Sequence, residues 1–331
     1  MIKTVLVTGG AGYVGAVLVP KLLKIGYRVK VFDWFLYDKN VFKEYRSNSQ
    51  LEEIHGDIRD TKQVSNALRG VDAVVHLACI SNDPSFELDP ALGKSINYDA
   101  TKQLVDLSLH AGVKRFVYAS SSSVYGVKKE REVTEELPLT PLTDYSKYKV
   151  LCEEYIVSKK SEGMTTLILR PATVCGYSPR MRFDLTVNML TLQALVNKKI
   201  TVYGGRQLRP NIHIKDMVEA YLQSLSFPAR LIHGKTYNVG YENYSVLEIA
   251  RMIKRTLGDS SISIDVSPTN DLRSYKITSK KIEQELGFAP AHTIEDAVLD
   301  IKRAFNHGKF QSPLRNPSYY NIKMMQNGKI I

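Results

Sequence analysis

The chain has 331 residues, 44% of them hydrophobic and 24% charged, and its formal net charge is +11. This length accommodates about two domains with a sizeable core, and the composition is that of an ordinary folded protein, which excludes disordered, collagen-like and fibrous chains. Six of the basic residues lie in the acid-free segment Ile301–Ile331, so the remainder carries only +5 and a nucleic-acid-binding protein is disfavoured.

In chain order, short runs rich in β-branched residues alternate with longer amphipathic stretches. The first are a strand at Thr4–Val7, a helix at Val17–Ile25 and a strand at Arg28–Phe32. Further strands are predicted at Ala73–Leu77, Arg115–Ala119, Thr166–Leu169 and Thr236–Val239, and helices at Ala100–His110, Ser146–Lys160 and Leu185–Val196. Because the strands are almost entirely apolar, both faces of the sheet should be covered. We therefore predict an α/β fold with a Rossmann-like, doubly wound parallel sheet.

The character of the sequence changes after Gly176, where a polar and basic stretch begins. The apolar strand at Thr236–Val239 nevertheless resembles those of the first part, so we expect the chain to return to the first sheet. This predicts a first domain over residues 1–176 with a returning segment near 205–240. A smaller, interleaved domain then comprises residues 177–204 and 241–331.

A glycine-rich turn, Thr8–Gly15, joins the first predicted strand to the first helix. Gly9 permits a tight turn, Gly12 lets the backbone approach a diphosphate, and Gly15 allows the helix to pack closely. The N–H groups and the positive end of the helix dipole favour an anion at this place. The turn therefore predicts a dinucleotide site in the first domain.

Asp33 ends the second predicted strand, eighteen residues after Gly15, which is near the spacing expected of an acid that binds ribose hydroxyls. A carboxylate there repels the 2′-phosphate of NADP, and the adjacent Trp34 and Phe35 offer no cation to offset this repulsion. The sequence therefore favours NAD over NADP as the cofactor.

Tyr145 and Lys149 are four residues apart and so share one face of a predicted helix. A phenol with a pKa near 10 is a poor base at neutral pH. A lysine ammonium close by, together with a positive nicotinamide ring, stabilises the phenolate and makes Tyr145 usable as an acid or base. A tyrosine and a lysine four residues apart are common on exposed helices, so the pair indicates a catalytic function here only because it follows the dinucleotide motif.

Four consecutive serines, Ser120–Ser123, directly follow the predicted strand Arg115–Ala119. Active-site groups of open α/β sheets gather at the carboxyl ends of strands, so one of these hydroxyls is expected to bind the reacting oxygen. The other serines are expected to cap backbone groups of the loop.

The three cysteines, Cys79, Cys152 and Cys175, are widely spaced in apolar surroundings, which favours reduced thiols over a disulfide framework or a zinc site. We expect no bound metal. The apolar start at Val5–Val7 is interrupted by glycines, and no run approaches the ~20 apolar residues of a membrane span, so a cytoplasmic protein is expected.

Together these features resemble the extended short-chain dehydrogenase/reductase family, in particular its branch of NAD-dependent nucleotide-sugar epimerases and dehydratases. The resemblance covers most of the chain and rests on Thr8–Gly15, Asp33, Gly56-Asp57, His76–Ala78, Asn97, Ser120–Gly126, Tyr145 with Lys149, and Arg170–Thr173. It implies that Ser121, Tyr145 and Lys149 are catalytic. It implies NAD contacts by Gly9, Gly12, Tyr13, Val14, Asp33, Asp57, Ile58, Leu77, Ala78, Cys79, Asn97, Tyr145, Lys149 and Pro171.

The resemblance also distinguishes between reactions. Dehydratases of the family carry an acid and a base directly after the catalytic hydroxyl residue, where this chain has Ser122 and Ser123, which readily do neither job. A nucleotide-sugar 4-epimerase is therefore expected: Tyr145 takes the proton of the sugar 4-hydroxyl, Ser121 binds that oxygen, and a transient 4-keto sugar forms as hydride passes to NAD.

Two alternatives stay open. The segment Ser178–Asn188 resembles a subgroup that includes UDP-glucose 4-epimerases and a GDP-heptose 4-dehydrogenase, so a 4-dehydrogenase or 4-ketoreductase without epimerisation is the second interpretation. A non-catalytic NAD-binding sensor is the third, because a fold alone does not establish chemistry.

The expected substrate is a nucleotide-diphosphate sugar. Arginine side chains suit its phosphates, and the resemblance implies substrate contacts by Ser121, Ser122, Arg180, Arg182, Asn188, Arg209 and Arg273. Related enzymes pair the helices that correspond to Ala100–His110 and Ser146–Lys160 across a twofold axis, so a homodimer is expected.

Overall fold

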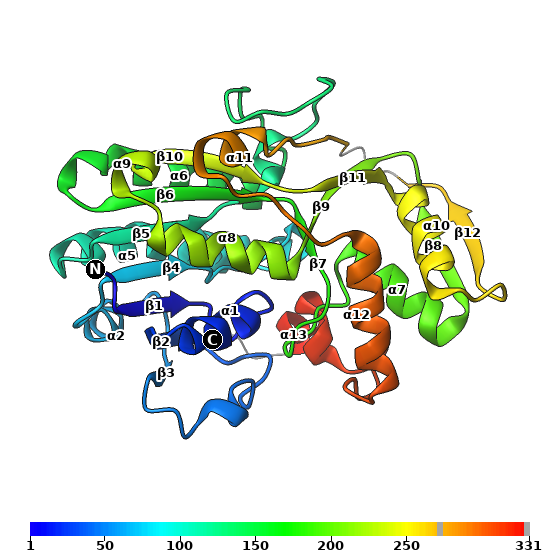
Figure 1. Ribbon diagram of the computed structural model, residues 1–331, viewed down its shortest axis with the longest axis horizontal. Coiled ribbons are helices and arrows are strands. Elements are labelled where there is room, and N and C mark those ends of the chain that lie inside the picture. Colours follow the sequence, from blue (N-terminus) through cyan, green and yellow to red (C-terminus); the bar gives the residue numbers. More distant parts are fainter. Residues whose placement is uncertain (270–273, 328–331) are drawn as a thin grey trace.

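The centre of the computed structural model, which describes residues 1–269 and 274–327, is a seven-stranded parallel sheet (Figure 1). In sheet order its strands are β10 (Lys235–Val239), β6 (Thr165–Pro171), β5 (Arg115–Ala119), β4 (Ala73–His76), β1 (Thr4–Thr8), β2 (Arg28–Asp33) and β3 (Leu51–His55). Strand β1 pairs with β2 on one side and with β4 on the other, so the strand order reverses beside it. The predicted Rossmann-like α/β fold is confirmed.

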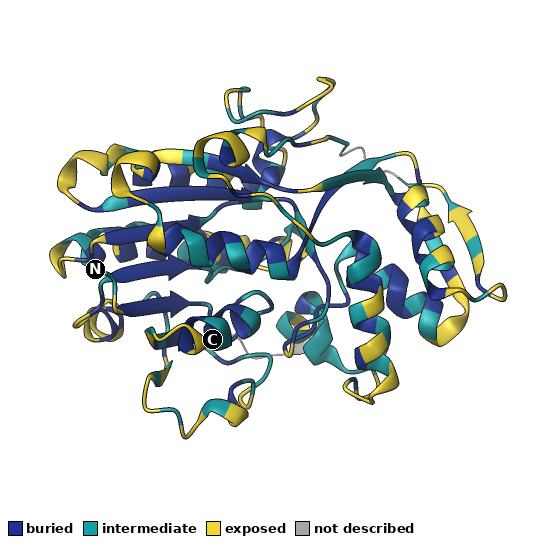
Figure 2. Ribbon diagram, viewed as in Figure 1, coloured by how far each residue is buried: buried dark blue, intermediate teal, exposed yellow. Residues whose placement is uncertain are grey.

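Both faces of the sheet are covered by helices, because alternate residues of each strand enter different cores. In β1, Val5 and Val7 belong to the core formed with α1 (Gly15–Lys24) and α8 (Ile214–Ser226). Leu6 points to the opposite face, whose core includes residues of α2 (Thr61–Ala67), α5 (Ala100–His110) and α6 (Asp144–Ser158). Figure 2 shows these strands buried and the outer sides of the helices exposed.

A second group of helices and strands, called here the second part of the chain, packs on the carboxyl side of this sheet (Figure 1). Its helices α7 (Thr186–Asn197), α10 (Val246–Leu257) and α12 (Ile294–Asn306) share a third core that includes Val187, Ile253 and Val298. Its strands are β7 (Thr173–Cys175), β9 (Leu208–His213) and β11 (Glu242–Ser245) in one small sheet, and β8 (Lys199–Tyr203) with β12 (Ser263–Ser267) in another. The returning strand β10 pairs with β6, while the domain division at residue 176 stays a prediction.

The described part of the acid-free C-terminal segment, residues 301–327, folds back onto the molecule (Figure 1). The Phe183 ring meets Phe310 and Tyr319 edge to face, with ring centroids 5.0 and 5.4 Å apart. The last helix, α13 (Asn321–Asn327), then contacts the short helix α3 (Asp83–Glu87), which follows β4. The remaining short helices are α4 (Pro90–Lys94), α9 (Ala229–Ile232) and α11 (Lys280–Leu286).

Within the described ranges, we find no helix whose length and apolar character would let it cross a membrane.

Candidate active site

A cavity of about 450 Å³ lies at the carboxyl ends of the central strands. Its wall combines the glycine-rich turn, the end of β2, the loops after β4 and β5, the start of α6, and residues of the second part of the chain. Of the residues predicted to bind cofactor or substrate, those lining it are Gly9, Gly12, Tyr13, Val14, Asp33, Ile58, Leu77, Ala78, Cys79, Ser121, Ser122, Tyr145, Pro171, Arg180, Arg182 and Arg209.

The glycine-rich turn gives this cavity an end suited to a diphosphate. Gly9 has a φ of +71°, and a Cβ on it would come 2.5 Å from the backbone nitrogen of Ala78, so only glycine fits between the turn and the loop after β4. Helix α1 has no acidic residue in its first turn, and no side chain of the described residues caps its Val14 end. Its first N–H groups and the positive end of its dipole therefore face the cavity as an anion site.

Asp33 lies next to this turn, where its carboxylate accepts hydrogen bonds from the N–H groups of Ala11 (3.0 Å) and Phe35 (2.7 Å). Burial raises the pKa of Asp33, although these two bonds oppose the shift. Each carboxylate oxygen keeps capacity for a further hydrogen bond, which matches the two hydroxyls of a ribose. The chemistry of the turn and of Asp33 thus fits NAD.

Three predicted cofactor residues lie outside the cavity lining, namely Asp57, Asn97 and Lys149. Asp57 forms an ion pair with Arg59 at 2.6 Å, and the Arg59 guanidinium lies 5.5 Å from the centre of the Trp34 ring. A cation is therefore present near Trp34, although Asp57 balances its charge. Asn97 is buried and exchanges two hydrogen bonds with the backbone of Ile80 (2.8 and 3.0 Å), so it supports the loop after β4.

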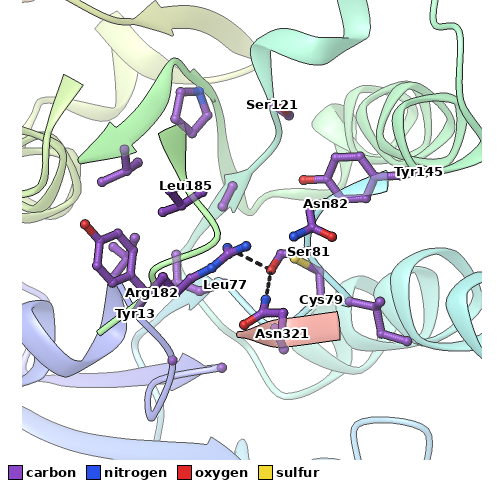
Figure 3. Close-up of a pocket in the computed structure, with 18 of the residues that line it drawn as sticks. Tyr13, Leu77, Cys79, Ser81, Asn82, Ser121, Tyr145, Arg182, Leu185 and Asn321 are labelled. Carbon is purple, nitrogen blue, oxygen red and sulfur yellow. Dashed lines mark hydrogen bonds between the residues drawn. The ribbon is translucent and has the colours of Figure 1, made fainter. Parts of the chain in front are cut away.

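Tyr145 enters the cavity from the first turn of α6. A capping box fixes the start of this helix, because the hydroxyls of Thr143 and Ser146 each accept the other residue's N–H. Figure 3 shows the Tyr145 hydroxyl pointing into the cavity on the same side as Ser121. Burial raises the pKa of Tyr145 well above its ordinary value, and the hydrogen bond with Ser121 lowers it only in part.

Lys149 lies behind Tyr145 rather than in the cavity wall. Its ammonium donates to the carbonyl of Ala119 at 2.6 Å and lies 5.9 Å from the centre of the Tyr145 ring. Burial dominates the pKa of Tyr145, and the charge of Arg182 opposes the shift only in part. The pKa of Tyr145 is therefore raised, and its lowering by Lys149 together with a nicotinamide ring stays a prediction.

The loop that carries the four serines, Ser120–Ser123, is hydrogen-bonded to a buried ion pair. The Arg170 guanidinium binds the carboxylate of Glu153, with contacts of 2.6 to 3.2 Å, and the same carboxylate accepts a hydrogen bond from Ser120. Arg170 also donates to the Tyr125 hydroxyl at 2.8 Å, and Tyr125 donates to Asn238 at 2.7 Å. This network joins β6, α6 and the loop after β5, and so holds Ser121 in place.

The predicted substrate residues occupy different surroundings. The Ser122 hydroxyl lies 3.2 Å from the Tyr275 hydroxyl, and Arg209 lines the cavity. Asn188 is buried behind the wall, where its side-chain amide binds the Gly176 N–H (2.9 Å) and the Tyr13 hydroxyl (3.0 Å). Arg273 lies outside the described residues.

Arg182 and Arg180 are both buried, but their partners differ. Arg182 pairs with Asp184 at 2.8 Å and donates to the Ser81 hydroxyl at 3.1 Å. Arg180 stacks on the ring of Tyr37, with its guanidinium carbon 3.6 Å from the ring centre. Arg180 and Tyr37 both line the cavity, and the predicted contact of Arg180 with substrate stays a prediction.

Several residues that line the cavity were not predicted from the sequence as site residues. Ser81, Asn82 and Asp83 follow β4, and Asp83 accepts a hydrogen bond from the Thr143 hydroxyl at 2.6 Å. Their place after an apolar strand is a usable signal, because ligands bind beyond the carboxyl ends of such strands. Asn321 and Met325 reach the wall from α13, for which no local pattern exists.

A model of the NAD dependent epimerase/dehydratase family matches residues 5–240. The UDP-glucose 4-epimerase of Lactobacillus helveticus is 29% identical over 89% of this chain and 94% of that protein. Among solved structures, the UDP-glucuronic acid 4-epimerase of Bacillus cereus in complex with UDP-glucuronic acid and NAD has a TM-score of 0.81 and 29% identity, covering 91% of this chain and 99% of that one. The dTDP-glucose 4,6-dehydratase of Streptomyces venezuelae with NAD and TYD bound has a TM-score of 0.84 and 26% identity, covering 94% and 100%.

Proposed function

This chain belongs to the NAD-dependent epimerase/dehydratase family, and we propose that within it the protein is a nucleotide-sugar 4-epimerase. NAD is its cofactor. Both relatives with a bound cofactor carry NAD in this fold, and here Gly9, Gly12 and Asp33 line the end of the cavity whose chemistry fits it.

The proposed reaction takes place at C4 of the sugar. When bound, NAD supplies a reversible hydride acceptor for C4 and, in its nicotinamide ring, a positive charge that favours the phenolate of Tyr145. Tyr145 then takes the proton of the 4-hydroxyl, Ser121 holds the same oxygen, and Lys149 stabilises the phenolate. A 4-keto sugar results, and Tyr145 returns the proton once the sugar has presented its other face.

The observation that carries this proposal is the pairing of Ser121 and Tyr145 in the cavity without an acid–base pair beside them. Ser122 contacts the Tyr275 hydroxyl, and the Ser123 hydroxyl accepts a hydrogen bond from Ser121 at 2.9 Å. Elimination of water needs an acid and a base at these positions, and serine hydroxyls provide neither at neutral pH. This supports proton and hydride exchange at C4 over dehydration.

The substrate we propose is a nucleoside-diphosphate sugar held by arginines of the second part of the chain. UDP-glucuronic acid occupies the related Bacillus cereus enzyme, and Arg209 and Arg182 line the corresponding cavity here. An arginine fork matches the geometry of phosphate oxygens, so these side chains suit the diphosphate.

The test uses the protein as purified, with its own cofactor and no added NAD. UDP-, GDP-, CDP- and dTDP-sugars are incubated singly, and the configuration at C4 is resolved after the incubation. An epimerase yields the same equilibrium mixture from either epimer of its substrate. Stoichiometric 4-keto product with reduced nicotinamide identifies a 4-dehydrogenase instead, and absence of any sugar conversion favours an NAD-binding sensor.

We also propose that the protein is a homodimer formed by α5 and α6. Leu151 on α6 is 38% exposed, so it is available for contact with a second copy of the chain. Sedimentation as a dimer is expected, with Leu151→Glu shifting the protein towards the monomer. A monomeric wild-type protein contradicts this proposal.

A further inference from the structure

We propose that Arg180 is a ligand of the diphosphate of NAD, and that Asn321 of the C-terminal helix positions it, so that the C-terminal segment retains the cofactor. The proposal goes beyond the reaction at C4 and rests only on NAD as the cofactor. It also gives the acid-free C-terminal segment a function, as one wall of the cofactor site.

The position of Arg180 is the first argument. Its charge is close enough to Asp33 and to Tyr13 to stabilise the ionised form of each side chain. Asp33 is the acid suited to the ribose, and Tyr13 belongs to the glycine-rich turn suited to the diphosphate. In a dinucleotide the diphosphate is bonded directly to this ribose, so a guanidinium in the same cavity wall whose charge acts on both Asp33 and Tyr13 is suited to the phosphates.

The missing partners of Arg180 are the second argument. The side chain is only 4% exposed, and in the described ranges no carboxylate lies within ion-pair distance of it. Its Nη2 donates to the side-chain oxygen of Asn321 at 2.5 Å, while its Nε has no hydrogen-bond partner among the described residues. A buried cation that forms no ion pair is costly even though the charges of Asp184 and Asp33 act on it from farther away. A phosphate in contact with Arg180 provides both a counter-charge and a hydrogen-bond acceptor.

Asn321 ties three parts of the wall together. Its side-chain amide accepts from Arg180 and donates to the Ser81 hydroxyl at 2.8 Å, and its backbone N–H donates to Asp184 at 3.0 Å. Figure 3 shows Asn321 and Arg182 meeting at Ser81. Asn321 is 3% exposed, and Met325, one turn later on α13, also lines the cavity.

This arrangement predicts how NAD leaves the protein. The loop after β4, the segment around Arg180 and α13 converge on Asn321, so widening the cavity at this place breaks several buried hydrogen bonds together. Slow release follows from this coupling. Retention of the cofactor suits an enzyme that oxidises and reduces the same sugar in turn, because no external oxidant is then consumed.

The experiment measures nucleotide binding rather than turnover, so its failure is separate from failure of the proposed reaction. Calorimetric titrations with NAD, ADP and adenosine are made on cofactor-stripped wild type, Arg180→Gln and Arg180→Lys. Removing a charged hydrogen bond to a phosphate is expected to weaken NAD and ADP binding by about 10- to 100-fold in Arg180→Gln. Adenosine binding should change by less than about threefold, and Arg180→Lys should be intermediate.

Two results overturn the role of Arg180. One is wild-type affinity of Arg180→Gln for ADP, and the other is an equal loss for adenosine and ADP, which indicates a damaged ribose pocket. Melting temperature without nucleotide checks the fold, and if Arg180→Gln does not fold, the same comparison of ADP with adenosine is made on Arg180→Lys.

Asn321 is tested through the rate at which NAD dissociates into excess competing nucleotide. Asn321→Ala should speed release about 10-fold, whereas Gln326→Ala, an exposed position on the same helix, should not. Because Asn321 is proposed to act through Arg180, Asn321→Ala should add little in an Arg180→Gln background. Additive effects, or an unchanged rate in Asn321→Ala, contradict the positioning role.

Discussion

Two buried arginines, one in the cavity wall and one outside it, differ in what surrounds them. Arg170, below the serine loop, binds the Glu153 carboxylate, which raises the pKa of Arg170 although burial opposes this. Arg180, in the cavity wall, has an amide and a tyrosine ring as neighbours, and burial lowers the pKa of Arg180 to about 10. Arg170 therefore has its counter-ion within the protein, whereas we propose that Arg180 acquires a counter-ion from the cofactor.

The largest expected effect separates the proton transfer proposed for Tyr145 from the binding of NAD. Tyr145→Phe removes the proton-transferring hydroxyl and should lower the rate of C4 conversion by about 10²- to 10⁴-fold. NAD affinity, measured by titration, should stay within about threefold because the phenol is not near the diphosphate. Tyr148→Phe, on the same helix but packed between Tyr98 and Phe86, is the control and should keep its rate. A fully active Tyr145→Phe variant contradicts the proposed mechanism.

The next effect concerns the contribution of the Arg170–Glu153 ion pair to the free energy of unfolding. Glu153→Gln leaves the buried Arg170 without its counter-ion and should lower the free energy of unfolding by about 3–5 kcal/mol. Denaturant titration measures this loss, with Glu154→Gln, an exposed position next to it, as the control. A loss below about 1 kcal/mol would show that Arg170 is not held by this pair.

The Arg182–Asp184 ion pair makes the stability of the protein depend on pH. Burial raises the pKa of Asp184, but Arg182 outweighs burial and holds it below the ordinary value. The stabilisation is thus complete above the unfolded pKa of about 3.9 and is lost as pH falls through the lower, folded value. Asp184→Asn should cost about 1–3 kcal/mol at neutral pH, with the difference from wild type narrowing below about pH 4.

Urea titrations over a series of pH values test this expectation. Asp144→Asn removes an exposed carboxylate paired with Lys147 and is the control, for which little change in stability is expected at any pH. A deficit of Asp184→Asn that stays constant down to pH 3 would show that its cause is not the charge of Asp184.

The smallest expected effect on stability tests whether Arg180, unlike Arg170, contributes little to the free energy of unfolding. Arg180→Met removes a buried charge that forms no ion pair with another described residue, so without NAD the variant should be within about 1 kcal/mol of wild type or more stable. The increase in melting temperature on adding NAD should be smaller than in wild type, since weaker binding stabilises the native state less. A loss as large as that of Glu153→Gln would mean that both arginines are structural.

The sequence predicted the central fold well because its strands are buried on both faces. The predicted strands at Arg115–Ala119 and Thr236–Val239 match β5 and β10 to within a residue at each end. Strand β3 escaped prediction, because it lies at the sheet edge and its Glu52 and Glu53 interrupt any apolar run. The short strands of the second part are set by tertiary contacts that no local pattern reveals.

The candidate site was predictable where chemistry follows a strand, as at Gly9, Asp33 and Ser121, all of which line the cavity. Their roles stay predictions. The contact between Arg180 and Asn321 joins positions 141 residues apart, and the contact between Asn321 and Ser81 joins positions 240 apart. Such pairings depend on how the C-terminal segment folds back, so the sequence alone gave Arg180 no partner and placed it with the substrate.

The most direct test of the proposed 4-epimerase follows the hydrogen at C4. A nucleotide sugar that the protein accepts, labelled with deuterium at C4, is incubated with the as-purified protein in ordinary water. We expect inversion at C4 with the deuterium kept on that carbon, because the cofactor that removes it is retained and returns it to the same sugar. Transfer of the label to reduced nicotinamide with release of a 4-keto sugar, or inversion with loss of the label to solvent, would contradict it.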